Sequence, residues 1–100
     1  MSTGVAFLPI HPGEVLVEEY LSPLALSQHR LAMAIGVSPR RINKIVHGQG
    51  RISADTALRL SLYFGTSERF WMNLQGRYDL EFERDRLSQV LEEITPLVRN

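Results

Sequence analysis

Apolar residues recur at helical spacing in several short segments of the chain, and Pro, Gly and Ser residues separate these segments. In EVLVEEYL at 14–21, Leu16 and Tyr20 fall on one face and Glu14 and Glu18 on the other. No segment alternates between apolar and polar residues as a strand would. We expect Gly76 to weaken or end the fifth helix, and the chain from Asp79 onward to be helical again. The other predicted helices are QHRLAMAI at 28–35, RRINKIVH at 40–47, ADTALRLSLYF at 54–64 and ERFWMNLQ at 68–75.

This pattern predicts an all-α fold: a compact domain of five helices with a C-terminal helical extension. We place the domain at residues 1–78 and the extension, expected to contact a second copy or a partner, at 79–100. The residues at the helix ends agree, because serine suits an N-cap and glycine suits the position after a helix. The predicted N-caps are Ser27, Ser38, Ser53 and Ser67, and the predicted stops include Gly36, Gly48 and Gly65.

Residues 28–47 have the spacing of a helix-turn-helix. Only residues 36–38 separate the two helices, which must therefore cross at a steep angle. Ala32 is small enough for a close approach, and Gly36 tolerates the positive φ that the turn requires. Apolar residues seat both helices on the core. We expect these to be Leu31, Ile35, Val37, Ile42 and Ile45.

The second of these helices has a cationic outer face. At 100° per residue, Ile42 and Ile45 fall on the core side, and Arg40, Lys44 and His47 fall opposite. Arginine reads guanine and asparagine reads adenine in the major groove, where the first residues of such a helix reach the bases. The alternatives are a plain solvated helix and, for His47, a cap on its own helix. The predicted base-reading residues are Pro39, Arg40, Arg41 and Asn43, and the predicted phosphate-binding residues are Ser27, Gln28, Ser38, Lys44 and Arg51.

The charge distribution supports an anionic partner. The 100 residues have a formal net charge of zero, but residues 27–51 hold five cations and no acid. Residues 1–26 hold three glutamates and no cation, and residues 79–100 hold six acids against three arginines. A basic block between acidic segments favours one anionic and one cationic partner.

The same composition narrows the class of protein. The absence of cysteine excludes thiolate nucleophiles and cysteine metal sites. No apolar run approaches the roughly 20 residues that span a membrane, and the N-terminus lacks a signal-peptide pattern. We therefore expect a cytoplasmic protein with no membrane partner. His11 and Glu14 have the i, i+3 spacing of a metal pair but no third ligand, so a local cap or turn contact is favoured, and no catalytic residue, metal site or cofactor is predicted.

An apolar stripe at the end of the domain suits a second copy of the chain. Phe70, Trp71, Leu74 and Tyr78 lie at helical spacing, and the tail stripe is too long to be buried in so small a domain. The alternative is that the aromatic residues complete the core of the monomer. The predicted homodimer interface consists of Phe70, Trp71, Leu74, Tyr78, Leu87 and Leu91.

IHPGEVLVEEYL at 10–21 and the segment from LSQHRLAMAIGVSPRRINKIVHG to NLQGRYDLE at 26–81 resemble the HigA-type (VapI-like) antitoxins of the Xre/lambda-repressor superfamily. The resemblance implies a lambda-repressor-like fold and a homodimer that binds double-stranded operator DNA and represses its own operon. It also implies that the chain neutralises a small basic HigB/RelE-like toxin, an mRNA interferase. The alternatives are a stand-alone Xre-family repressor without a toxin and an interaction module that grips an acidic protein.

Overall fold

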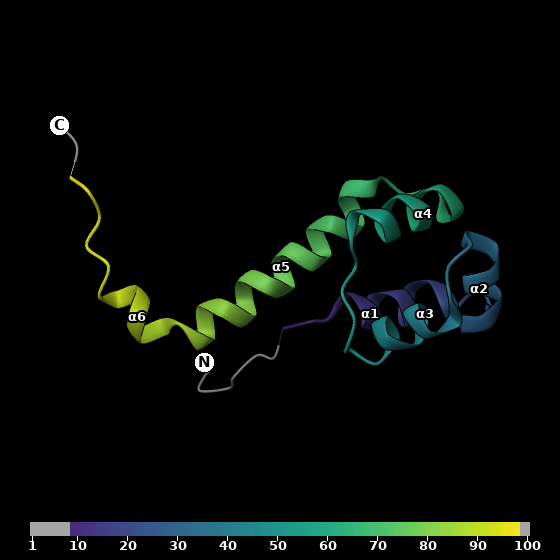
Figure 1. The fold of residues 1–100 in the computed structure, drawn as a ribbon, viewed down its shortest axis with the longest axis horizontal. Coiled ribbons are helices and arrows are strands. Elements are labelled where there is room, and N and C mark those ends of the chain that lie inside the picture. The colour runs from purple at the N-terminus through teal and green to yellow at the C-terminus, as the bar shows by residue number, and fades with distance from the viewer. Residues whose placement is uncertain (1–8, 99–100) are drawn as a thin grey trace.

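The computed structural model describes residues 9–98, and every regular element among them is helical. α1 (Pro12–Leu16) continues into the π-helical turn η1 (Val17–Leu21), and α2 (Gln28–Ile35) and α3 (Pro39–Val46) form the helix-turn-helix. α1 to α4 form a compact body, from which the far half of α5 projects, with α6 beyond it (Figure 1). The all-α prediction is confirmed. α4 spans Ala54–Phe64, α5 Glu68–Arg86 and α6 Ser88–Glu92.

The predicted helix boundaries depend on local hydrogen bonds that the structure contains. The four predicted serine caps each accept a backbone N–H from three residues ahead, as N-cap residues do. Gly36 ends α2 at φ 73°, a conformation in which a side chain would be strained. The boundaries of α2, α3 and α4 are therefore set within each segment, as the sequence predicted.

The fifth helix does not end at Gly76, one of the two outcomes predicted for this residue. α5 runs through Gly76 for 19 residues, from Glu68 to Arg86, so the predicted division after residue 78 falls inside this helix. One glycine in a helix costs only about 1 kcal/mol relative to alanine. Side-chain pairs one turn apart span the position: Gln75 bonds Asp79 at 3.0 Å, and Arg77 pairs with Glu81 at 3.2 Å.

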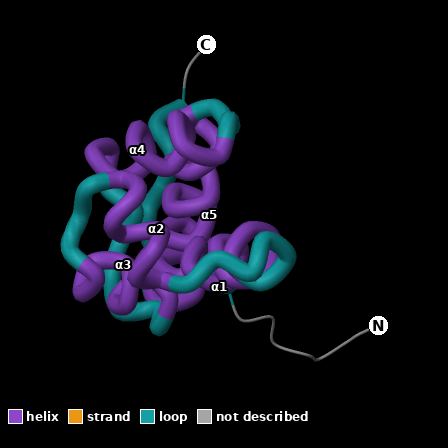
Figure 2. Tube along the Cα trace, turned by 90° about the vertical axis from the view of Figure 1, so that its right-hand side faces the viewer, coloured by secondary structure: helices purple, strands orange, loops and turns teal. Residues whose placement is uncertain are grey.

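The core lies between α1, the helix-turn-helix, α4 and the first half of α5. Figure 2, turned by 90° from Figure 1, shows these helices gathered around it. The five apolar residues predicted to seat the helix-turn-helix are all buried, which confirms that prediction. Leu16, Leu60 and Trp71 belong to the same cluster and have no exposed surface.

Trp71 belongs to this core, so its assignment to the dimer interface is wrong. Its indole is fully buried, packs on Tyr20 at a centroid distance of 5.2 Å, and donates its Nε1–H to Thr66 Oγ1 at 2.8 Å. Phe70 and Leu74 are partly buried and pack against the same cluster. The first half of this stripe on α5 thus faces inward, where its packing against the core holds α5 on α4 and α1.

The start of α1 is pressed against the end of α3. A Cβ on Gly13 would lie 1.8 Å from the carbonyl oxygen of Ile45, so only glycine fits between the two helices. His11 caps α1, with Nδ1 accepting from the N–H of Gly13 at 2.9 Å. The HPGE segment therefore caps α1, as the cap interpretation predicts, and His11 is the capping residue. No helix among residues 9–98 is long and apolar enough to cross a membrane, and those residues hold no group of three possible metal ligands.

The burial of His11 predicts a pH dependence of stability. Burial lowers the pKa of His11, although a hydrogen bond to Gly50 and the charges of Asp79 and Glu14 oppose the shift. Because the unfolded chain takes up this proton near pH 6.5 and the folded chain only at lower pH, stability is highest above pH 6.5 and falls as the pH drops towards the folded pKa. We expect a lower melting temperature at about pH 5 than at about pH 7.5. His11→Asn keeps an N-cap acceptor and does not titrate, so an equal pH dependence in this variant would contradict the prediction.

Candidate nucleic-acid interface

The outer face of α3 is formed by exposed polar and cationic side chains. Ile42 and Ile45 point into the core, and the residues between and before them are exposed, as the helical angles predicted. None of the acidic residues of the chain lies on α2, α3 or the turn between them. A phosphate backbone approaching this face would meet no like charge. The exposed side chains are Arg40, Arg41, Asn43, Lys44 and His47.

Two of these cations are available for a ligand. The ion pairs within residues 9–98 involve neither Arg40 nor Lys44. Arg40 is the second residue of α3, which is where a recognition helix meets the bases, and Lys44 lies one turn further along the same face.

Arg41 is held by α4 and is not a free guanidinium. Its Nη1 donates to Asp55 Oδ1 at 2.9 Å and to Thr56 Oγ1 at 3.3 Å. Asp55 also accepts from Arg59 Nε at 2.8 Å. Hydrogen bonds from Arg41 and then from Arg59 hold the pKa of Asp55 below its usual value. The side chain thus ties the start of α3 to α4, and this contact competes with the base contact predicted for Arg41.

The same network reaches the turn of the helix-turn-helix. Arg59 Nη1 donates to the carbonyl oxygens of Ile35 at 2.7 Å and Gly36 at 3.2 Å, and so satisfies the last carbonyls of α2. Asp55 and Arg59 therefore fix α2 and α3 relative to α4. The sequence analysis did not identify these two residues, because the contacts join residues 14 to 24 positions apart and have no local pattern.

Polar side chains of α2 and the two caps extend this surface. Asn43 Nδ2 donates to Gln28 Oε1 at 3.2 Å, which brings a predicted base-reading residue beside a predicted phosphate-binding one. Ser27 and Ser38 accept backbone N–H groups, and each hydroxyl keeps its own proton to donate. His47 Nδ1 lies 2.8 Å from the carbonyl oxygen of Asn43, which supports the cap interpretation of this residue.

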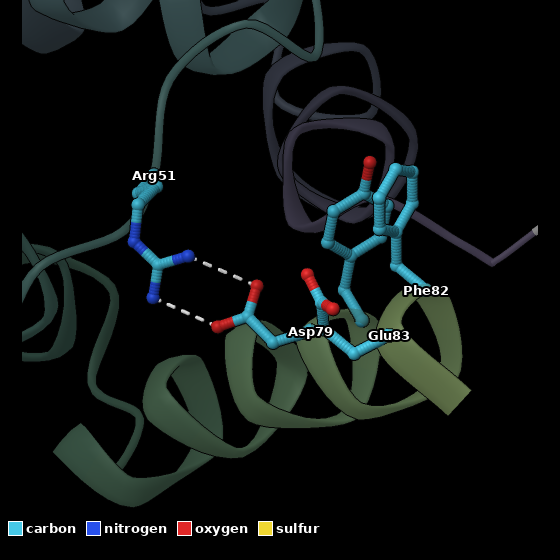
Figure 3. Close-up of a pocket in the computed structure, with 5 residues that line it drawn as sticks. Arg51, Asp79, Phe82 and Glu83 are labelled. Atoms are coloured by element: carbon cyan, nitrogen blue, oxygen red, sulfur yellow. Dashed lines mark hydrogen bonds and ion pairs between the residues drawn. The ribbon is translucent and has the colours of Figure 1, made fainter. Parts of the chain in front are cut away.

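The loop after α3 closes the surface on the side of α5. Arg51 makes two hydrogen bonds to Asp79 of α5, and the pair borders a pocket of about 440 Å³ lined also by Tyr78, Phe82 and Glu83 (Figure 3). This contact engages the guanidinium that was predicted to bind phosphate. The pKa of Asp79 is lowered, first by the hydrogen bond from Arg51.

A buried glutamine anchors the same loop to α5. Gln75 is 2% exposed, and its Oε1 accepts the N–H of Ile52 at 2.8 Å. Its Nε2 donates to Asp79 Oδ1 at 3.0 Å, so both ends of the amide are satisfied. The only local sign of this residue was its position one turn after Trp71, on the buried side of α5.

Known proteins resemble this chain in sequence and in fold. A family model described as helix-turn-helix matches residues 17–71. Virulence-associated protein I of Dichelobacter nodosus is 58% identical over 80 residues, covering 79% of this chain and 74% of that protein. Antitoxin HigA-1 of Vibrio cholerae is 32% identical over 89 residues, covering 89% and 84%. The solved structure of Pseudomonas aeruginosa antitoxin HigA with the higBA promoter is 47% identical, has a TM-score of 0.86, and covers 90% of this chain and 99% of that one.

Proposed function

Because this chain belongs to the Xre-type helix-turn-helix family, we propose that it is an antitoxin that binds the operator DNA of its own operon and neutralises a HigB/RelE-like mRNA interferase. The observation that carries the DNA half is the face of α3, where Arg40, Asn43 and Lys44 lie exposed with no acidic residue on either helix of the motif. The HigA structure that resembles this chain holds promoter DNA, which supports the same role here.

On operator DNA, α3 lies in the major groove. Arg40 donates two hydrogen bonds to a guanine, Asn43 pairs with an adenine, and Pro39 contacts a thymine methyl group. Lys44 and Gln28 bind phosphates at the edges of the motif, with Ser27 and Ser38 donating from the helix N-termini. Arg41 supports the site through Asp55, so its loss acts on the angle of α3 and not directly on a base.

The homodimer forms through the outer face of α5. Met72, Gly76 and Leu80 follow one another at one-turn intervals and line a shallow groove of about 530 Å³. Gly76 has no neighbour within 4 Å of a Cβ position, so a second helix can approach the backbone closely there. Leu87 and Leu91, both predicted for the interface, lie beyond this groove, Leu87 directly after α5 and Leu91 in α6. Two-fold symmetry then presents two α3 helices to two half-sites.

The toxin half of the proposal is supported by relatives named as antitoxins and by the acidic segments. A nuclease that grips RNA is expected to be basic, and an acidic surface complements it. Glu18 and Glu19 lie exposed on η1, with no cation in residues 1–26. On α5, Glu81 and Glu83 pair with Arg77 and Arg86 of the same helix, so the acidic surface of η1 complements a basic partner better.

Co-expression with the neighbouring small reading frame tests the proposal. We expect the tagged neighbour to be toxic alone, to be tolerated with this chain, and to co-purify with it at a fixed stoichiometry. Light scattering of the purified chain checks the dimer. A neighbouring gene product that is neither toxic nor bound by this chain would contradict the antitoxin role. The chain would then be a stand-alone repressor, and DNA footprinting would locate its operator.

A further inference from the structure

Arg51, in the loop between α3 and α4, pairs with Asp79 of α5 in the geometry that a phosphate would also adopt. Arg51 Nη1 donates to Asp79 Oδ1 at 3.0 Å, and Nη2 donates to Oδ2 at 2.8 Å, as the two dashed lines of Figure 3 show. This parallel pair of hydrogen bonds is the geometry in which arginine also binds a phosphate. Asp79 therefore occupies the donors that DNA would use.

Arg51 lies beside the surface through which we propose that the chain binds DNA. The N–H groups of Gln49 and Gly50 both donate to the carbonyl oxygen of Lys44, at 2.8 and 2.9 Å, which folds the loop back onto the end of α3. A Cβ on Gly50 would lie 3.0 Å from Lys44 Cβ, so the loop is in close contact with the helix. Arg51 follows directly, so the loop places it next to the end of the helix whose Lys44 we propose to bind a phosphate.

The two members of the pair differ in how firmly they are held. Asp79 is fixed by Gln75, which is buried and bonded at its other end to Ile52. The side chain of Arg51 is 68% exposed and that of Asp79 34%, so water screens the pair and little free energy is lost when the arginine changes partner. The carboxylate thus stays in place while the guanidinium exchanges.

We propose that Asp79 competes with a DNA phosphate for Arg51 and so lowers the affinity of the chain for DNA. On non-specific DNA the contacts are electrostatic and loosely placed, so the guanidinium stays on the carboxylate for much of the time. On the operator, base contacts by α3 set the register and bring one phosphate to Arg51, which must leave Asp79 to bind it. The inference rests on the proposed DNA-binding function and adds to it a residue of α5, outside the helix-turn-helix.

Asp79→Asn tests this, with binding measured on a short random-sequence duplex and on a duplex from the chain's own promoter region. We expect affinity for the promoter duplex to rise about three- to fivefold, because Arg51 no longer has to leave an exposed ion pair to reach its phosphate. Affinity for the random duplex should rise by no more than this, since its phosphates are less well placed for Arg51. The salt dependence on the random duplex should steepen by up to about one phosphate contact.

Two variants separate this effect from a general loss of negative charge. Glu83→Gln removes one carboxylate a turn further along α5, where Glu83 pairs with Arg86 and not with Arg51. We expect no gain in affinity for either duplex from it. In the Arg51→Ala background, Asp79→Asn should also have no effect. An equal gain in Glu83→Gln, or a gain that persists without Arg51, would overturn the proposal.

Binding by the wild type separates a failure of the proposed function from a failure of this inference. If it binds the promoter duplex no better than the random one, the proposed function fails and this inference fails with it. If it prefers the promoter and Asp79→Asn leaves promoter-duplex affinity unchanged, only the inference fails. Melting curves confirm that each variant is folded, and Asp79→Ala, which has no side-chain acceptor for Arg51, replaces Asp79→Asn should the amide disturb folding.

Discussion

Replacing Gly13 with alanine is expected to lower the free energy of unfolding by about 3 kcal/mol or more, the upper end of the cost of overpacking. The added Cβ would lie 1.8 Å from the carbonyl oxygen of Ile45 and 2.7 Å from its carbonyl carbon. Both atoms belong to the backbone of α3, so no side chain can turn away to make room. α1 and α3 must separate, which opens the core around Leu16 and Ile42.

Gly76→Ala is the matched control for this variant. It makes the same change in a helix where nothing lies within 4 Å of the new Cβ, and it should stabilise the monomer by about 0.5–1 kcal/mol. Because Gly76 also lies in the proposed dimer interface, both variants are unfolded at a protein concentration at which light scattering shows the monomer. Urea unfolding followed by circular dichroism measures both. A Gly13→Ala protein as stable as the wild type would show that α1 does not dock on α3 in this way.

Replacing Arg40 with alanine is expected to weaken operator binding by about 1–3 kcal/mol, or roughly 5- to 150-fold, and to relax the base preference at one position. Arg40 is exposed at the start of α3, and no ion pair within residues 9–98 engages it. Because its loss breaks none of these ion pairs, we expect the effect to appear in binding and not in the melting temperature. Fluorescence anisotropy on operator and single-base variants measures it.

Two other cations serve as controls for Arg40. Lys44→Ala should weaken operator and random duplexes alike and reduce the salt slope by about 1, as the loss of a phosphate contact does. Arg69→Ala removes one exposed charge from the start of α5, away from α3, and should change operator affinity little. If Arg40→Ala behaves like Arg69→Ala, base reading does not depend on Arg40.

The sequence alone was sufficient for features that depend on neighbouring residues. Serine caps, the left-handed turn at Gly36 and the inward face of Ile42 and Ile45 follow from hydrogen bonds and angles within a few residues. These features define the helix-turn-helix and the cationic face of α3. The resemblance to HigA-type antitoxins then gave the family, which the comparisons confirm.

Only the tertiary structure decided which of the predicted groups are free to act. Arg41 and Arg51 belong to the basic block, yet acids 14 and 28 residues away engage them, and that depends on how α4 and α5 pack. Trp71 moved from the predicted interface to the core, because a helix stripe has no partner until the docking angle is known. Local patterns thus determined where each helix lies and which face it buries, whereas charge pairing and the true outer face of α5 depended on contacts between helices distant in sequence.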